Sequence, residues 1–212
     1  LGRGPRLRMD AEMIRDNALA VSGLISLKPF GPPIKPYQPQ GIWTKVGGTN
    51  YEYTVSPGGD RYRRGVYVVI KRGAPYPSFI NFDVSGRLTC TTQRSRSNTP
   101  LQALTLLNDP VYVEAIKAIA LRAATDGKHQ SLESTIDQTF RHILARRPNE
   151  SESDTLALLY RDQHVAATAS PQTANRLAKD VQLPHDVSPV DFSAWYSVAT
   201  VMMNLHETIT KE

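Results

Sequence analysis

The stretch that decides the fold is SNTPLQALTLLNDPVYVEA, residues 97–115, because it contains two helix starts ten residues apart. Thr99 precedes Pro100, and Asp109 precedes Pro110. In each pair a capping side chain stands before a proline, whose missing N–H costs nothing in the first turn of a helix. A proline also disfavours helical backbone in the residue before it, so the second pair ends the first helix. The stretch therefore predicts two helices joined by almost no loop.

Polar side chains in and near this stretch are candidates for a site. Asn108 has helical spacing with Leu101 and Leu104, which predicts that all three share a buried face of the first helix. A buried amide without partners would cost about 1 to 3 kcal/mol, so Asn108 must find them. We interpret Asp83 as a partner for an arginine or as a turn cap, with a catalytic acid as the alternative. The candidate polar cluster consists of Asp83, Asn98, Gln102 and Asn108.

Residues 99–212 carry further helix signals. Ser188 again precedes a proline, and Asn149 with Glu152 has the spacing of a capping box. Apolar side chains then recur at helical spacing in each segment. We expect a loop at 169–186, between the last two helices.

Residues 28–98 have a different composition, with 8 of the 15 prolines and 9 of the 13 glycines of the chain. Prolines and glycines interrupt long helices and strands, so the segment is predicted to be irregular. Its many aromatic side chains argue against disorder, since leaving them in water would be costly. Val66 to Ile70 has strand propensity, although so short a run is also compatible with a buried helical turn.

The predicted fold is mainly α. We expect a helix at 10–25, a long Pro/Gly/Tyr-rich irregular excursion at 28–98 with one or two short strands, and a helical bundle-like body at 99–212. A length of 212 residues suggests a single domain. The chain begins LGRGPRLRMD, without an initiator Met, and we interpret it as a C-terminal fragment of a longer chain. No apolar run approaches the roughly 20 residues that a membrane span needs.

Cysteine and histidine residues give little support for a metal or cofactor site. The single cysteine, Cys90, excludes a disulfide framework, a cysteine-rich zinc site and the C-x-x-C-H attachment of a c-type haem. Nearby arginines would make Cys90 a better nucleophile, but we interpret it as a small buried residue. The five histidines show no H-E-x-x-H spacing. We therefore expect neither a metal nor a cofactor in this chain.

Basic residues concentrate in the irregular segment, where 11 Lys and Arg stand against 3 Asp and Glu. They could bind an anion, such as a phosphate, an acidic sugar or an acidic partner surface. Alternatively, they tie the irregular segment to the helical body by pairing with backbone carbonyls and carboxylates. Nucleic acid is not expected, because these short groups match no recognition motif. The candidate anion-binding or partner-binding residues are Arg61, Arg63, Arg64, Lys71, Arg72, Arg94 and Arg96.

Four segments carry a family resemblance. They are RLRMDAEMIRDNALAVSGL, GGDRYRRGVYVVIKRGAPYPSFINFD, CTTQRSRSNTPLQALTLLNDPVYVEA and AWYSVATVMMNLHETITKE. In this order they resemble the C-terminal domain of unknown function of planctomycete-type cytochrome-c-containing multidomain proteins. Gly65 and Val69 depart from the resemblance, since the family tends to a more helical, aromatic stretch there.

The resemblance implies an extracytoplasmic protein, periplasmic or at the cell surface, whose neighbouring domains are the first candidate partners. Haem would then belong to another domain of the full-length chain. The family has no established catalytic residues, so the resemblance assigns no role to any side chain here.

Three functions follow from these observations. The first is a non-catalytic interaction module that packs against a neighbouring domain. The second is part of an enzyme that acts on polysaccharide-derived sugars, with oxidation coupled to a cytochrome region. It requires Arg63, Arg64, Asp83, Asn98 and Asn108 to converge. The third is a carbohydrate-binding module for polysaccharide, which requires Trp43 and the tyrosines to be exposed.

Overall fold

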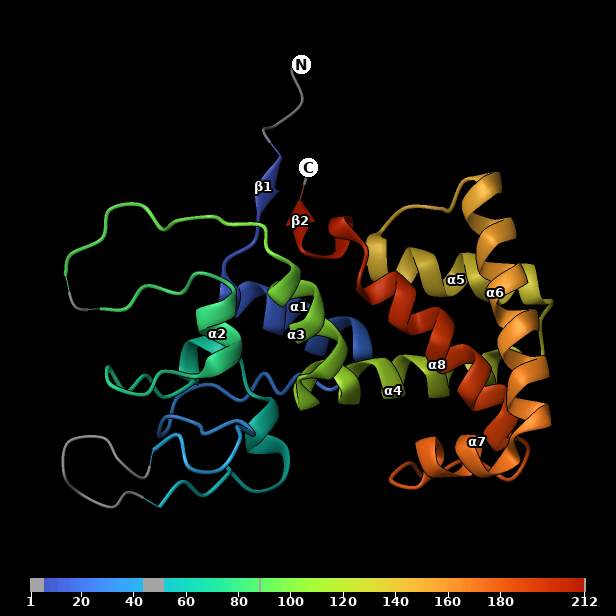
Figure 1. Ribbon diagram of the computed structural model, residues 1–212, viewed down its shortest axis with the longest axis horizontal. Helices are drawn as coiled ribbons and strands as arrows, with labels where there is room; N and C mark the ends of the chain where they lie inside the picture. Colours follow the sequence, from blue (N-terminus) through green and yellow to red (C-terminus); the bar gives the residue numbers. More distant parts are fainter. Residues whose placement is uncertain (1–5, 44–51, 88, 212) are drawn as a thin grey trace. The chain divides into compact units, whose positions relative to one another are not determined.

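The computed structural model describes residues 6–43, 52–87 and 89–211 (Figure 1). The chain forms two compact units. The first unit comprises Leu1–Val113 together with Ile209–Glu212, and the second comprises Glu114–Thr208. Helices predominate, so the predicted mainly α fold is confirmed. Among the described residues, no helix is both long enough and apolar enough to cross a bilayer.

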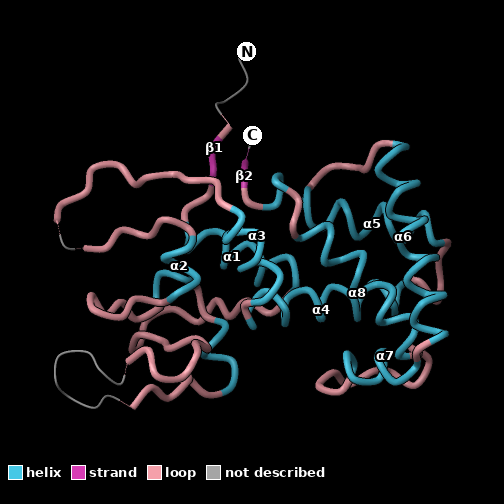
Figure 2. Tube along the Cα trace, in the orientation of Figure 1, coloured by secondary structure: helices cyan, strands magenta, loops and turns pink. Residues whose placement is uncertain are grey.

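The first unit is built around three short helices and a two-stranded antiparallel sheet. In the sheet, Leu7 is opposite Lys211 and Arg8 is opposite Thr210. Figure 2 shows that loops make up much of the remainder of this unit. Its elements are β1 (Leu7–Arg8), α1 (Ala11–Ser22), η1 (Gly58–Tyr62), η2 (Gly65–Tyr67), α2 (Pro77–Asn81), α3 (Pro100–Asn108) and β2 (Thr210–Lys211).

Helix α1 buries Ile14, Ala18 and Leu19, which have the helical spacing of a core-facing stripe. It ends at Gly23, whose φ of 77° lies in the left-handed region that glycine adopts without strain. The N–H of Gly23 donates to the carbonyl of Ala20, which satisfies one free acceptor at the helix end.

Two isolated parallel bridges order the irregular segment, one between Ser26, just before the segment, and Arg63, and one between Ile34 and Val68 inside it. Val66 to Ile70 is therefore neither the expected strand nor a full helical turn. A 3-10 turn, η2, is followed by extended backbone at Val68. Ile34 donates to the carbonyl of Tyr67 at 2.7 Å and accepts from Val69 at 2.9 Å. A single bridge replaces a ladder because turns interrupt the chain on both sides.

Helix α4 (Pro110–Asp126) begins directly after α3, as the two proline pairs predict. The junction is Asp109, which has extended backbone (φ −67°, ψ 130°). Its Oδ1 accepts from the N–H of Val111 at 3.0 Å, so it caps the second helix. The residue thus ends α3 and starts α4 by local chemistry alone.

The second unit is a helical assembly in which α8 packs against α5, α6 and α7. Phe192, Trp195, Val198 and Met202 of α8 are buried. Besides the remainder of α4, its elements are α5 (Leu132–Leu144), α6 (Glu150–Ala169), α7 (Pro171–Ala178), α8 (Pro189–Met203) and η3 (His206–Thr208).

The expected loop at 169–186 is wrong in its first half, which forms α7. Ser170 precedes Pro171, the same start signal that was used elsewhere in the sequence. The buried positions of α7 are only Ala174 and Ala178. Such small side chains let α7 lie close to α8, but they give no apolar stripe that the sequence pattern could reveal.

Candidate partner-binding groove

Arg63 lies at the centre of the first unit rather than at a binding surface. It is 1% exposed, and its guanidinium donates to the carbonyls of Lys28, Phe30 and Pro32. The same group lies 3.9 Å from the ring centroid of Tyr67. Arg63 therefore pairs with backbone carbonyls, as the second interpretation of the basic residues expects, but these carbonyls belong to the irregular segment itself and not to the helical body.

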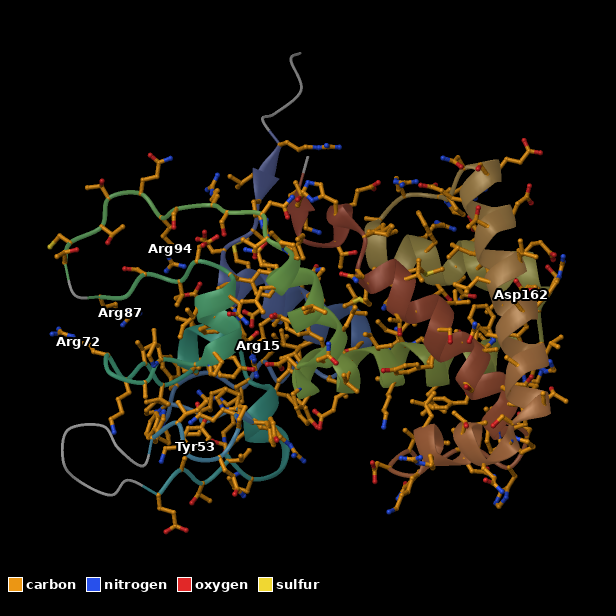
Figure 3. All side chains as sticks on the ribbon, in the orientation of Figure 1. Arg15, Tyr53, Arg72, Arg87, Arg94 and Asp162 are labelled. Atoms are coloured by element: carbon orange, nitrogen blue, oxygen red, sulfur yellow. The ribbon has the colours of Figure 1, made fainter. Side chains whose placement is uncertain are left out.

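Arg15 has a similar role. The sequence does not indicate this role, because the pattern of α1 is that of an ordinary amphipathic helix. Its side chain is also 1% exposed and donates to the carbonyls of Arg63 at 2.7 Å and Arg61 at 2.6 Å. Figure 3 shows Arg15 inside the first unit, whereas Arg72 and Arg87 lie at its periphery. Buried guanidinium groups thus satisfy carbonyls that no ladder or helix satisfies.

Two further candidates pair with carboxylates of α1. Arg64 lies 3.3 Å from Asp16, whose other oxygen accepts from the N–H of Gly65 at 2.6 Å. Arg94 forms two bonds to Glu12, at 2.6 and 3.2 Å. The hydrogen bond to Glu12 raises the pKa of Arg94 above its usual value. An external anion would have to displace these internal partners.

The remaining candidates lie in different surroundings. Lys71 lies over the ring of Trp43 at 4.7 Å, and Arg61 over the ring of Tyr62 at 5.2 Å. Arg72 and Arg96 are exposed. The seven side chains are therefore distributed among several internal partners and open solvent.

The predicted polar cluster divides into two parts. Asp83 accepts from the N–H of Ser97 at 2.7 Å and from its hydroxyl at 2.8 Å. Gln102 is buried, donates to the same hydroxyl at 3.2 Å and accepts from Arg8 at 2.5 Å. Burial lowers the pKa of Arg8, although the charge of Asp83 opposes this effect. Asp83, Ser97, Gln102 and Arg8 thus form one connected network.

Asn98 and Asn108 stay outside this network. Asn98 is exposed, and so is Asn108, so the prediction of a buried Asn108 amide is wrong. Its Nδ2 donates to the carbonyl of Leu104 at 2.9 Å on its own helix. Leu101 and Leu104 do share its side of α3, but they are 53% and 54% exposed. The three residues do share one side of α3, as their spacing predicts, but that side is exposed. Gln102, Thr105 and Leu106 form the buried side.

This exposed side of α3 borders a groove of about 460 Å³, called here the α3 groove. Tyr37, Pro39 and Pro77 line it together with Leu101, Leu104 and Asn108. Asn81 also lines the groove, and its Nδ2 donates to the Thr105 hydroxyl at 2.8 Å, which connects α2 to α3. The α3 groove is therefore an open apolar surface, and a hydrogen bond joins the two helices that border it.

Asp109 gives this groove a charged end. Its carboxylate oxygens lie 3.4 Å from the hydroxyl of Tyr76, which is buried. Burial, reinforced by the charge of Asp109, raises the pKa of Tyr76 well above its usual value. Tyr76 thus stays a neutral donor toward Asp109.

Trp43 does not offer the stacking surface that the carbohydrate-binding alternative requires. It is buried, and its indole N–H donates to the carbonyl of Ala74 at 3.0 Å. The ring of Tyr53 lies edge-on to it at 4.8 Å.

The prediction that Cys90 is buried is wrong, because its side chain is exposed. Its neighbours Thr89 and Thr91 are exposed too, so no core forms around this part of the chain.

The second unit contains a polar network that the sequence indicated only as a helix cap. Asp191 accepts from Lys128 and from the hydroxyl of Ser188, both at 2.8 Å. Its other oxygen lies 3.3 Å from His164 Nε2 and 3.4 Å from the Tyr160 hydroxyl. Burial raises the pKa of Tyr160 to about 12. The network joins α6, α8 and the turn after α4.

No group of three or more His, Cys, Asp or Glu side chains suitable for a metal ion occurs in the described part of the chain. Of the candidate binding residues, Arg63, Arg64 and Arg94 are engaged by partners inside the first unit.

The family model of PSD1, described as a protein of unknown function (DUF1553), matches residues 1–160. No curated protein and no solved structure matches the chain. The expectation of a domain of unknown function is thereby confirmed, whereas an association with cytochrome c stays a prediction. Because the match covers well over half of the sequence, the chain belongs to the PSD1 family of proteins of unknown function.

Proposed function

We propose that this protein is a non-catalytic interaction module whose α3 groove receives an apolar segment of a neighbouring domain in the same longer chain. The observation that carries this proposal is the exposure of two leucines one helical turn apart, Leu101 and Leu104, beside Tyr37 and two prolines. Single exposed leucines are common on protein surfaces, but a contiguous lined groove is typical of a binding surface.

The energetics favour an apolar occupant. Full burial of a leucine contributes about 1.5 to 3 kcal/mol, so covering these two half-exposed side chains would contribute on the order of 1 kcal/mol each. Asn108 and Asp109 at the end of the groove can orient the occupant, since both carry acceptor oxygens. The occupant is therefore expected to present apolar side chains followed by a donor group.

The enzyme and carbohydrate alternatives have less support. The residues that the enzyme requires lie in separate settings, with Arg63 buried, Asp83 bonded to Ser97 and Asn108 on the groove. The stacking surface that polysaccharide binding requires is absent at Trp43, which is buried.

Site-specific photo-cross-linking in the longer natural chain tests the interaction module. A photoreactive residue at position 104 should cross-link to a segment of the same chain outside residues 1–212. The matched control is position 158, because Leu158 on α6 is 58% exposed and does not line the groove. The proposal fails if a folded protein labelled at position 104 gives no intramolecular product, or if position 158 gives the same product.

We further propose, from the family resemblance alone, that the longer chain is extracytoplasmic and carries haem on another domain. Cell fractionation tests the location. Haem absorbance tests the cofactor, and it should accompany the longer chain and be absent from residues 1–212.

A further inference from the structure

The second unit has a pocket of about 490 Å³ that is separate from the α3 groove, called here the α4–α5 pocket. Ile119 and Ala123 of α4 line it although they are only 2% exposed, and Ala145, which is exposed, adds an apolar methyl group. Arg122 from α4 joins Arg141 and His142 from α5 around it. A volume of this size is typical of a site for a small molecule.

The basic groups in the pocket are close to one another. Arg122 Nη1 lies 2.6 Å from His142 Nε2. A guanidinium can only donate, so His142 Nε2 is the acceptor in this contact. The two helices thus bring a permanent cation and a hydrogen-bonding imidazole to the same side of the pocket.

Arg141 adds a second permanent cation that can turn to a ligand. Its charged partner on α5 is Asp137 at 3.8 Å, and the two side chains are 54% and 34% exposed. A pair of this kind on a helix surface contributes only about 0.3 to 0.5 kcal/mol, so a ligand can replace it. Asp126 also lines the pocket, but its single negative charge is outnumbered by the positive charges of Arg122 and Arg141.

We propose that the α4–α5 pocket binds a small organic carboxylate. The carboxylate accepts from Arg122 and Arg141, whose planar guanidinium groups match its two oxygens. The apolar part of the ligand contacts Ala145, which is exposed and lines the pocket beside the buried Ile119 and Ala123. This proposal concerns the second unit and goes beyond the interaction function proposed for the first.

Calorimetric titration of the whole chain with benzoate tests this site. Benzyl alcohol has a similar shape without the charge, and inorganic phosphate has charge without the apolar part. Benzoate should bind saturably. Benzyl alcohol should bind at least about tenfold more weakly, since it cannot form charge-assisted hydrogen bonds with the arginines. Phosphate should bind more weakly than benzoate because it has no apolar part. Equal binding of benzyl alcohol would refute the role of the arginines, and equal binding of phosphate would refute the role of the apolar surface.

Two variants locate the site. Arg122→Gln and Arg141→Gln should each weaken benzoate binding by about tenfold or more. Arg176→Gln is the control, because Arg176 is exposed on α7 and does not line the pocket. All three changes are at exposed positions, so unchanged helical circular dichroism is expected. Benzoate affinity that stays the same in both pocket variants, or falls equally in the control, overturns the proposal.

Discussion

At the scale of single residues, the first unit depends on two buried guanidinium groups, and the sequence suggests one of them, Arg63, for ligand binding. Arg63 and Arg15 are almost fully buried and donate to carbonyls of a segment rich in proline and glycine. Such a segment has few internal backbone bonds, so its buried carbonyls need donors from elsewhere. Arginine supplies several donors in one plane, which lysine cannot do.

Arg63→Lys should therefore lower the free energy of unfolding by about 2 to 4 kcal/mol, because one ammonium cannot reach three carbonyls and its charge stays buried. Urea denaturation measures the change. Arg72→Lys serves as the control, since Arg72 is exposed. If the two variants unfold at the same urea concentration, Arg63 does not have the structural role assigned to it.

Gly65 is a second position where one atom decides the packing. A Cβ added there would lie 2.9 Å from the backbone oxygen of Glu12, and backbone cannot move aside as a flexible side chain can. Gly65→Ala should destabilise the protein by about 1 to 3 kcal/mol. Gly59→Ala is the matched control, because a Cβ there meets nothing within 4 Å. Thermal unfolding of the two variants should differ clearly, and equal melting temperatures would contradict the close approach of η2 to α1.

At the scale of elements, the helices that begin with a capping residue and a proline could be predicted because their signals are local. The start of α3 at Thr99, the start of α4 at Asp109 and the cap of α8 at Ser188 all depend on neighbouring atoms. Helix α7 has the same signal at Ser170, yet its two buried alanines leave no apolar stripe. A capping residue followed by a proline therefore indicates a helix start even where no apolar stripe follows.

The side of a helix that is buried could not be predicted from α3 alone. Leu101, Leu104 and Asn108 share one side, as their spacing predicts, but α2 and Arg8 contact the other side through Thr105 and Gln102. Which side meets a neighbour depends on residues far away in the sequence. The same reason explains why the sequence does not indicate the role of Arg15, whose acceptors are the carbonyls of Arg61 and Arg63.

The N-terminus of α6 gives a prediction on pH. Glu152 accepts from the N–H of Asn149 at 2.8 Å and from two nitrogens of Arg146, each at 2.8 Å. The bonds from Arg146 lower the pKa of Glu152 to about 2. A carboxyl group with a lowered pKa stabilises the fold above its unfolded value, and this contribution is lost as the pH falls through the folded value.

Glu152→Gln should accordingly melt below the unchanged protein at about pH 7, and the difference should disappear between about pH 4.5 and pH 2. Glu150→Gln is the control, because it lies in the same first turn but outside the capping box. Melting temperatures measured across this range provide the test. A difference that persists at about pH 2 would show that the Glu152 carboxylate is not its source.

At the scale of the whole molecule, different interactions stabilise the two units. The first combines short helices with a long irregular segment, and buried arginines supply the donors that regular structure would otherwise provide. The second is mainly helical, and apolar side chains of α8 such as Phe192 and Val198 form its core. The α3 groove belongs to the first unit and the α4–α5 pocket to the second.

This division predicts that the two proposed sites can be removed separately. Leu104→Lys places a charge in the α3 groove and should abolish intramolecular cross-linking from a photoreactive residue at the groove position 101, while benzoate affinity stays unchanged. Arg122→Gln should do the reverse, since it removes a donor from the α4–α5 pocket and leaves Leu101 and Leu104 intact. Cross-linking yield and calorimetric affinity are measured for both variants in the longer chain. Loss of both properties in either variant would mean that the change acts on folding or that the sites are coupled, and separate functions for the two units would have to be abandoned.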